Sequence, residues 1–301
     1  TSLADAVRLL AERGDGAAIL AGGQSLLPIL AFRLASPEII VDLKKVPGLD
    51  EIAIDAKGVR LGASVRWCDI EGNGDLAIAH PLLVEATRHV AHYQIRNRGT
   101  VGGSIALADP AAELPGIAVT CEAGISLTGS SGERVVKAED FFLGPMATCI
   151  DPGEIVTEIR FPPWPKDRRW AFMEFARRRG DFALAGIALF YDLDTEGRAT
   201  GTHMGVIGAC HCPHRLAAAE TIIDGSQLDD AAMVAVRVAR TGSEVLGFLT
   251  ATESAKALNR VGLAADIPFC AAMDASNAVP ELGGNGRIRL IQGDHVPSGM
   301  C

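Results

Sequence analysis

Two pairs of adjacent glycines constrain the fold of this chain more than any other feature. Gly22 and Gly23 stand in Ala-Gly-Gly-Gln-Ser, residues 21–25, directly after an apolar run, and Gly102 and Gly103 stand in Thr-Val-Gly-Gly-Ser, residues 100–104. Glycine tolerates positive φ and lets the backbone approach a ligand closely, so that successive N–H groups can point at an anion. One such segment alone is equally well an ordinary tight turn. Two of them, each followed by a serine, predict two loops that grip one extended ligand, such as the pyrophosphate of a dinucleotide.

The second pair has more polar chemistry around it than the first. Arg96 and Arg98 can neutralise phosphate, the hydroxyls of Thr100 and Ser104 can donate hydrogen bonds, and Asp109 can accept one from a ribose or a ring N–H. The alternative is an ordinary hairpin with solvated arginines. The first pair lacks both the G-x-G-x-x-G spacing of a dinucleotide-binding turn and the Gly-Lys-Ser/Thr of a phosphate-binding loop.

Composition narrows the class of protein. The chain has 301 residues, of which 48% are apolar, and this length favours about two domains. A net charge of −9 argues against nucleic acid or an anionic membrane as the main partner. No apolar run reaches the roughly 18 residues that a membrane helix needs, and no signal peptide is recognisable. The seven cysteines are odd in number and scattered, which predicts reduced thiols in a cytoplasmic protein.

The order of predicted elements favours an α+β fold over a doubly wound sheet, because they do not alternate regularly between strand and helix. A helix from residue 2 to 10 begins with Ser2 and Asp5 at capping-box spacing. A strand at 17–21, an apolar segment at 26–34 and a strand at 39–43 then form a βαβ-like opening. Further segments are predicted as strands at 51–54, 59–63, 125–127 and 135–137 and as a helix from Pro81 to about residue 92.

The clearest boundary is Phe-Pro-Pro-Trp-Pro at residues 161–165, because three prolines in five residues can continue neither a helix nor a central strand. Beyond it the pattern predicts strands at 170–176, 183–192 and 202–207 and helices at 216–223 and 229–246. From about residue 261 the periodicity decays. We therefore expect an atypical, poorly ordered tail over residues 261–301.

Three other constellations are weaker. Cys210-His-Cys-Pro-His214 contains residues that bind metals, but the set is incomplete, and no metal site is predicted. No four cysteines have the spacing of an iron–sulfur cluster. His80, His89 and His92 are expected to be structural. The arginines at 177–179 are either a solvated run or a surface facing a partner subunit.

The glycine segments carry a family resemblance. Residues 21–28, and residues 100–104 with Ala-Asp-Pro-Ala-Ala-Glu-Leu-Pro at 108–115, resemble the two FAD-binding signatures of the medium subunit of molybdenum hydroxylases. This is the family of the carbon monoxide dehydrogenase flavoprotein and of the FAD domain of xanthine dehydrogenase. Residues 141–161 are similar to the segment that closes that FAD domain, and residues 175–183 resemble the start of its C-terminal domain. The resemblance continues in order to about residue 260, whereas residues 267–301 do not match.

The resemblance implies a fold and its domain limits. A two-subdomain FAD-binding domain of the vanillyl-alcohol-oxidase/PCMH type is expected over residues 1–163, divided at about residue 50. A C-terminal flavoprotein domain of antiparallel sheet plus helices is expected over residues 167–260.

The resemblance also implies roles for matching residues. Both glycine segments should hold the pyrophosphate of FAD through backbone N–H groups and hydroxyls, with contacts from Ala21, Gly22, Gly23, Gln24, Ser25, Leu26, Thr100, Gly102, Gly103 and Ser104. Asp109 should bind the ribityl or adenosine portion. Ile150 should pack on the isoalloxazine, and Phe182 should cover its outer face or control access of the electron acceptor.

The function implied is that of an FAD-carrying electron-transfer subunit in a heterotrimer. A large molybdopterin subunit and a small [2Fe-2S] subunit would be its partners, and NAD⁺ or another carrier would be its external acceptor. Two alternatives stay open at this point. One is a stand-alone FAD-dependent oxidase or dehydrogenase, although no pair of residues suited to act on a substrate is evident. The other is a nucleotide-binding regulatory or assembly protein without a redox role.

Overall fold

The computed structural model describes residues 2–226, 278–282 and 288–292, and the chain divides into two units, Thr1–Val238 and Ala239–Cys301. In the second unit, β14 (Ala278–Leu282) and β15 (Ile288–Gln292) pair as an antiparallel hairpin. The atypical, poorly ordered tail expected over residues 261–301 stays a prediction. The predicted helix at 229–246 and the other residues of the tail lie outside the described residues.

The first unit opens with a helix and a small parallel sheet. In α1 (Leu3–Arg13) the hydroxyl of Ser2 accepts the backbone N–H of Asp5, whose carboxylate accepts the N–H of Ser2, so the predicted capping box is confirmed. After a 3₁₀ turn, η1 (Gly14–Gly16), strand β1 (Ala17–Leu20) pairs in parallel with β2 (Ile39–Asp42), and α2 (Leu26–Ala31) lies between them in the chain. The βαβ-like opening is thereby confirmed.

A five-stranded antiparallel sheet follows, in the order β3-β4-β9-β5-β6. Its strands are β3 (Ile52–Asp55), β4 (Gly58–Gly62), β5 (Gly124–Gly129), β6 (Gly132–Lys137) and β9 (Ile155–Phe161). Leu61, Ile125 and Ile159 are fully buried on the face that carries the core. A short hairpin of β7 (Phe142–Gly144) and β8 (Ala147–Thr148) stands between β6 and β9 in the chain.

Seven short helices are inserted between the strands of this sheet. They are α3 (Trp67–Glu71), α4 (Gly74–Ala79), α5 (Pro81–Thr87), α6 (Tyr93–Arg96), α7 (Val101–Leu107), α8 (Glu113–Thr120) and α9 (Ala138–Phe141). The helix that starts at Pro81 ends earlier than predicted. Its C-cap is Arg88, and Ala91 has a positive φ of 41°, which an α-helix does not allow.

A four-stranded antiparallel sheet completes the described part of the first unit. It consists of β10 (Arg169–Phe175), β11 (Ala185–Leu193), β12 (Ala199–Ile207) and β13 (His214–Arg215), and it is followed by α10 (Ala217–Ile223). The predicted strands and the helix at 216–223 are confirmed, with ends shifted by up to three residues. The three prolines of residues 162–165 lie in the connection between β9 and β10.

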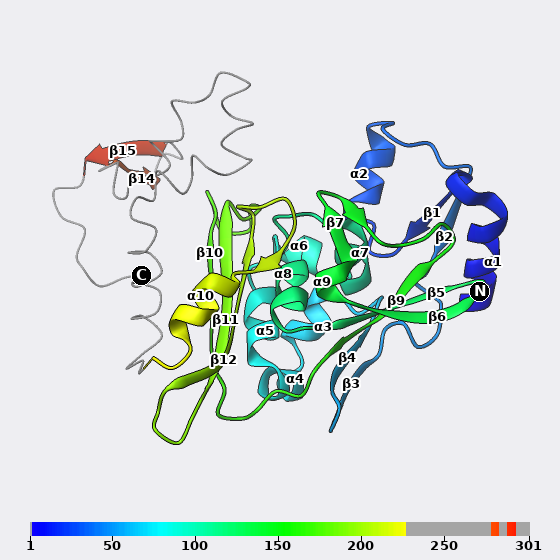
Figure 1. Ribbon diagram of the computed structural model, residues 1–301. Coiled ribbons are helices and arrows are strands. Elements are labelled where there is room, and N and C mark those ends of the chain that lie inside the picture. The colour runs from blue at the N-terminus through cyan, green and yellow to red at the C-terminus, as the bar shows by residue number, and fades with distance from the viewer. Residues whose placement is uncertain (1, 227–277, 283–287, 293–301) are drawn as a thin grey trace. The chain divides into compact units, whose positions relative to one another are not determined.

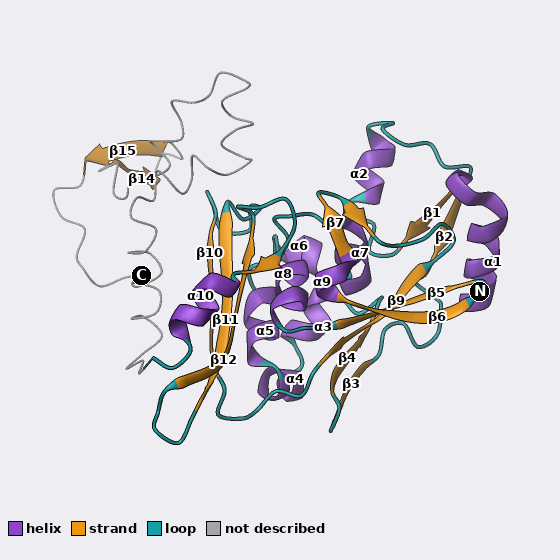
Figure 2. Cartoon of the chain, in the orientation of Figure 1, coloured by secondary structure: helices purple, strands orange, loops and turns teal. Residues whose placement is uncertain are grey.

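Helices α5 and α8 lie between the two sheets (Figure 1). Helix α5 contacts β10, α8 contacts β11 and β12, and α4 and α7 contact the five-stranded sheet. Helix α10 packs on the opposite face of the four-stranded sheet, where Leu189, Met204 and Ile223 form a small separate core. Figure 2 shows helices and strands mixed throughout the first unit, so the predicted α+β class is confirmed. None of the described helices is long and apolar enough to cross a membrane.

Candidate functional site

The fold brings the two glycine pairs together. The backbone at Gly22 packs so closely on the carbonyl of Arg98 and the Cα of Gly99 that a Cβ at residue 22 would overlap both. A Cβ added to Gly103 would lie 3.9 Å from the Cβ of Ala21, so the second pair also lies close to the first segment. Two segments far apart in the sequence therefore lie next to each other, and the space that the absent side chain of Gly103 leaves beside Ala21 is called the glycine gap below.

The first segment presents unused hydrogen-bond donors. It leaves β1 and turns through Gly23, whose φ is +72°. Its turn is closed by the Gln24 Nε2, which donates to the Gly22 carbonyl at 3.1 Å. Within the described residues, the backbone N–H groups of residues 22–25 take no part in the hydrogen bonds that hold the chain. Because backbone donors rarely stay unpaired in a native protein, these N–H groups are available to a ligand.

The second segment is a helix and not the predicted loop. Thr100 is the N-cap of α7, and its hydroxyl accepts the N–H of Gly103 at 3.3 Å. The N–H of Val101 donates to the Val65 carbonyl at 2.9 Å, and that of Gly102 donates to the Ala63 carbonyl at 2.8 Å. These tertiary bonds outweigh the low helix propensity of two glycines. The N–H groups of residues 101–103 are thus used within the protein. What the segment offers a ligand is close approach to the backbone and the hydroxyls of Thr100 and Ser104.

The two nearby arginines have different roles. Arg96 was a candidate for phosphate, but its guanidinium donates to the carboxylate of Glu71 at 2.8 Å and to the carbonyls of Val90 and Ala91 at 3.0 and 2.9 Å. Arg96 therefore fixes the turn before α6, and a role in binding phosphate is unsupported. Arg98 is exposed, and its carbonyl is the group that meets Gly22.

Asp109 lies where three elements meet. It follows Ala108, the left-handed C-cap of α7, whose carbonyl accepts the N–H of Met146 from the β7–β8 hairpin at 3.0 Å. The next carbonyl, that of Pro110, accepts the N–H of Gly208 after β12 at 2.8 Å. One carboxylate oxygen of Asp109 accepts the N–H of Ala111 at 2.9 Å, which leaves the other oxygen available. The loop that carries Asp109 is thus held by the β7–β8 hairpin and by the residue that follows β12.

Ile150 and Phe182 are held elsewhere. Ile150 is half-buried and packs against the main core beside the five-stranded sheet. Phe182 is 70% exposed, on the loop between β10 and β11, which is pinned where Gly180 packs on His92. The contacts that fix these two side chains involve neither glycine pair, so their roles in binding stay predictions.

The cysteine-histidine segment before α10 makes bonds within the chain. Cys210 Sγ lies 3.6 Å from the Val206 carbonyl, and His214 Nδ1 lies 3.2 Å from the Cys212 carbonyl. Burial raises the pKa of the Cys210 thiol to about 11, so it stays protonated at neutral pH. The described residues contain no group of three or more His, Cys, Asp or Glu side chains placed to hold a metal ion. Five cysteines are free thiols, and Cys270 and Cys301 lie outside the described part of the chain.

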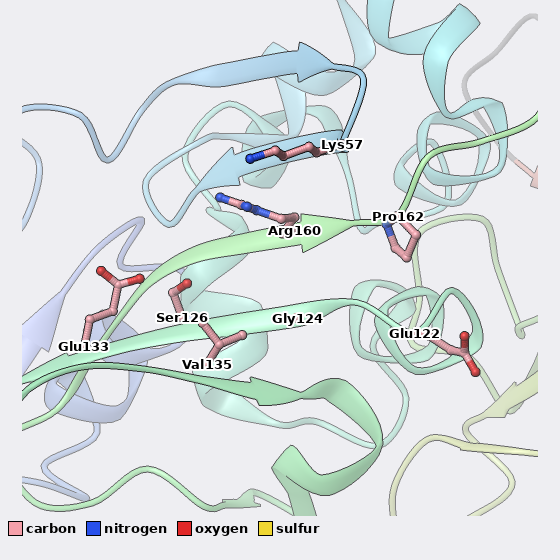
Figure 3. A pocket seen from close by; sticks show the side chains of 8 residues that line it. All are labelled: Lys57, Glu122, Gly124, Ser126, Glu133, Val135, Arg160 and Pro162. Atoms are coloured by element: carbon pink, nitrogen blue, oxygen red, sulfur yellow. The ribbon is translucent and has the colours of Figure 1, made fainter.

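A shallow groove of about 380 Å³ opens on the outer face of the five-stranded sheet, away from the glycine pairs. Figure 3 shows Lys57, Ser126 and Arg160 among the side chains that line it. Acidic and basic groups both line the groove, so its charge favours neither anionic nor cationic ligands.

Sequence reasoning missed two parts of this region. One is the backbone of Arg98 and Gly99, which contacts Gly22. Because only backbone atoms make this contact, no residue type in the sequence indicates it. The other is Glu174 in β10, whose side chain is 4% exposed. A single acidic residue in a strand pattern indicates nothing until the fold shows that it is buried.

Comparison with known proteins identifies the family of this chain. Residues 1–164 match the family described as FAD binding domain in molybdopterin dehydrogenase. Residues 208–285, most of them outside the described part of the chain, match a second family, described as 2-phosphosulpholactate phosphatase.

Among curated relatives, the 6-hydroxypseudooxynicotine dehydrogenase complex subunit alpha of Paenarthrobacter nicotinovorans is 39% identical over 227 residues, which are 75% of this chain and 77% of that protein. The carbon monoxide dehydrogenase medium chain of Afipia carboxidovorans is 35% identical over 232 residues, which are 77% of this chain and 80% of that protein.

Two solved structures show the same fold. Carbon monoxide dehydrogenase from Hydrogenophaga pseudoflava superimposes with a TM-score of 0.73 at 34% identity, over 76% of this chain and 79% of that one. Quinoline 2-oxidoreductase from Pseudomonas putida 86 superimposes with a TM-score of 0.72 at 36% identity, over 76% of this chain and 79% of that one. The predicted PCMH-type FAD-binding fold is thereby confirmed. The chain belongs to the FAD-binding medium subunits of the molybdenum hydroxylase family, as a flavoprotein component of an oxidoreductase.

Proposed function

We propose that this chain carries electrons, through FAD, within a cytoplasmic heterotrimeric molybdenum hydroxylase. A large molybdopterin subunit would oxidise the organic substrate, and a small [2Fe-2S] subunit would pass the electrons on one at a time. FAD supplies the two-electron chemistry that delivers them to an external acceptor, NAD⁺ or another carrier. The names of the relatives support the assembly, since they describe a complex subunit and a medium chain.

The observation that carries this proposal is the gap between the two glycine pairs. A pyrophosphate carries delocalised negative charge, which backbone N–H groups bind well where the backbone can come close. The free N–H groups of residues 22–25 meet that need, and Gly103 leaves the opposite wall without a side chain. The residues present therefore fit FAD. Ser25 and Ser104 would add hydroxyl donors, and Leu26 would close the gap at the start of α2.

The other predicted contacts belong to the rest of the cofactor. We assign Asp109 to the ribityl or adenosine hydroxyls, because its free carboxylate oxygen is an acceptor on a loop held by the β7–β8 hairpin and by the residue after β12. We assign Ile150 to the isoalloxazine and Phe182 to its outer face. The side chain of Phe182 is 70% exposed, and contact with the flavin ring or with a partner subunit would remove this apolar surface from water.

The strongest test uses Gly103, because its replacement changes the gap more than the fold. A Cβ at residue 103 would meet only the Thr100 hydroxyl, at 3.0 Å, and then Ala21 across the gap. We expect Gly103→Val to abolish FAD binding and Gly103→Ala to weaken it about tenfold or more, which is about 1.4 kcal/mol. The measurement is flavin content after purification and a Kd from flavin fluorescence.

Gly74→Ala is the matched control. Gly74 also stands in the first turn of a short helix, and a Cβ there would meet nothing within 4 Å. Gly23 is less suitable, because its φ of +72° would strain the backbone of any other residue. A loss of flavin in such a variant could then come from misfolding and not from a blocked binding site. Normal flavin content in a folded Gly103→Val chain would contradict the placement of the pyrophosphate.

A second experiment separates this function from a stand-alone flavoenzyme. The full chain, loaded with FAD and mixed with organic substrates but without partner subunits, should show no bleaching of flavin absorbance. Reduction by a substrate under these conditions would favour the stand-alone oxidase. Purification with bound ATP or NAD, and without flavin, would favour a regulatory nucleotide-binding protein.

A further inference from the structure

Helix α2, which follows the first glycine pair, is entirely apolar but has no buried face. Its sequence is Leu-Leu-Pro-Ile-Leu-Ala, and none of its six residues is buried. Leu27 within it is 43% exposed, and Phe32 and Leu34 just after it are each 77% exposed. Single apolar side chains are common on a protein surface, whereas a gathered set marks a site of contact. The exposure of α2 therefore indicates that another molecule covers it.

The backbone at the end of α2 holds these exposed side chains in place. The N–H of Leu34 donates to the carbonyl of Ile29 at 3.0 Å. The N–H of Arg33 donates to the carbonyl of Leu30, also at 3.0 Å, which completes a Schellman motif. Arg33 has the positive φ that this motif requires, 57°. Phe32 and Leu34 thus stand on an ordered turn, so a partner that covers them has little backbone freedom to remove.

A second exposed apolar segment is attached to the other end of α7. Leu143 and Met146 of the β7–β8 hairpin are 67% and 56% exposed. The N–H of Met146 donates to the carbonyl of Ala108 at the C-cap of α7, whereas Gly103 near the N-terminus of α7 lies beside Ala21. Helix α7 has seven residues and is therefore about 10 Å long. The two exposed segments are thus anchored about one short helix apart (Figure 1).

Together the two segments form what we call the apolar surface: Leu27, Phe32, Leu34, Leu143 and Met146. Its charge is positive where the first segment ends. Arg33 is exposed and is the only charged residue between residues 16 and 37, although the whole chain has a net charge of −9. A [2Fe-2S] cluster held by cysteine thiolates carries net negative charge. An apolar centre with a cation at its edge therefore suits a subunit that carries such a cluster.

Building on the proposed function, we propose that the apolar surface is where the small [2Fe-2S] subunit docks. Electrons pass from that subunit to FAD, so it has to cover the part of this chain beside the cofactor site. Helix α2 meets this requirement, because the Cδ1 of Leu27 would lie 2.9 Å from a Cβ added at Gly23 in the first glycine pair. The large subunit passes its electrons to the small subunit and carries no such requirement.

The test measures binding between the full chain with bound FAD and the purified small subunit of its complex, by isothermal titration calorimetry. We expect the double variant Phe32→Ser and Leu34→Ser to bind the small subunit about tenfold or more weakly, with unchanged flavin content. The matched control is Ile78→Ser with Ile222→Ser. These side chains are 83% and 56% exposed on α4 and α10, outside the apolar surface, and their loss should leave binding unchanged.

A kinetic measurement separates docking from electron transfer. The small subunit, reduced with dithionite, is mixed with the full chain, and flavin reduction is followed by absorbance. The concentration of small subunit that gives half the maximal rate should rise about tenfold or more in the double variant, while the maximal rate stays that of the parent. Leu143→Ser with Met146→Ser should raise it as well, and this second pair serves if the first does not fold.

Four outcomes would overturn the docking surface alone. They are parent-like binding of the small subunit by both folded double variants, loss of flavin from them, weaker binding of the large subunit in place of the small one, and a parent chain that is a dimer by gel filtration where the double variants are monomers. Loss of flavin would assign the apolar surface to the cofactor, and the change from dimer to monomer would assign it to a second copy of this chain. A parent chain that binds neither flavin nor the small subunit would overturn the proposed function as well.

Discussion

His80 shows how burial sets the chemistry of a single residue in this chain. The sequence predicts a structural role for it, and it is fully buried at the N-cap of α5, where its Nδ1 accepts the N–H of Leu83 at 3.3 Å. Its ring lies 4.4 Å from Trp164 and 5.1 Å from Phe161, between centroids. Burial lowers the pKa of His80 to about 3. The imidazole is therefore neutral, with its proton on Nε2, because Nδ1 is the acceptor.

This shift predicts a loss of stability in acid. In the unfolded chain His80 takes up a proton below about pH 6.5, whereas in the folded chain it stays neutral down to about pH 3. Between these values the unfolded state binds more protons, so the free energy of unfolding falls as pH falls. His80 alone should lower it by about 2 kcal/mol on going from about pH 7.5 to pH 5. Urea denaturation at both pH values measures the loss.

His80→Asn gives the control, because asparagine keeps an N-cap acceptor and does not titrate. The variant should be less stable than the parent at pH 7.5, since it loses the contact with Trp164. Its stability should change by about 2 kcal/mol less than that of the parent over the same pH range. An equally steep loss in both proteins would assign the acid sensitivity to other groups.

At the scale of elements, α8 and β12 approach each other through two glycines. Every residue of α8 is buried. A Cβ at Gly116 would overlap the Cγ2 methyl of Ile207, and one at Gly205 would overlap the hydroxyl of Thr120. This close packing joins the helices beside the five-stranded sheet to the four-stranded sheet, and the same contact region fixes the Pro110 carbonyl against Gly208 next to Asp109. The position of the Asp109 loop therefore depends on it.

We expect Gly116→Ala to destabilise the fold, although helix propensity alone favours alanine over glycine by about 1 kcal/mol. The added methyl group overpacks the contact with Ile207, which typically costs about 1 to 3 kcal/mol. Gly74→Ala, at an exposed position at the start of α4, should stay within about 0.5 kcal/mol of the parent. Adding Ile207→Leu, which lacks the Cγ2 methyl, should recover part of the loss at Gly116. Additive effects of the two changes, measured by urea denaturation, would show that Gly116 and Ile207 do not meet.

Sequence patterns predicted elements whose cause is local. The capping box of α1 and the alternating strands of both sheets follow from spacing alone. The helical state of Val101–Leu107 could not be predicted, because it depends on bonds from Val101 and Gly102 to the carbonyls of Val65 and Ala63. The same holds for Arg96, whose partners are a carboxylate and two carbonyls. For the site, motif resemblance predicted the glycine pairs, but which N–H groups are free depends on the fold.

At the scale of the whole molecule, the candidate site is assembled from both sheets of one unit. The glycine gap belongs to the parallel pair of strands and the five-stranded sheet with its helices. The Asp109 loop is tied to the residues after β12, and Phe182 lies between β10 and β11. All of these residues fall within Thr1–Val238. The relatives and solved structures named above likewise cover 75–77% of the chain, whereas residues 208–285 match a different family.

A chain that ends at Val238 should therefore fold and bind FAD as the full chain does. The reason is that both glycine pairs, the Asp109 loop and the two larger sheets lie within the first unit, Thr1–Val238. We expect flavin content, the flavin Kd and the unfolding midpoint of the first unit to match those of the full chain within error. A matched truncation at Ile207, which removes β13 and α10 and the Gly208 bond to Pro110, should lower both stability and flavin affinity. Loss of flavin in the chain that ends at Val238 would show that Ala239–Cys301 takes part in the site.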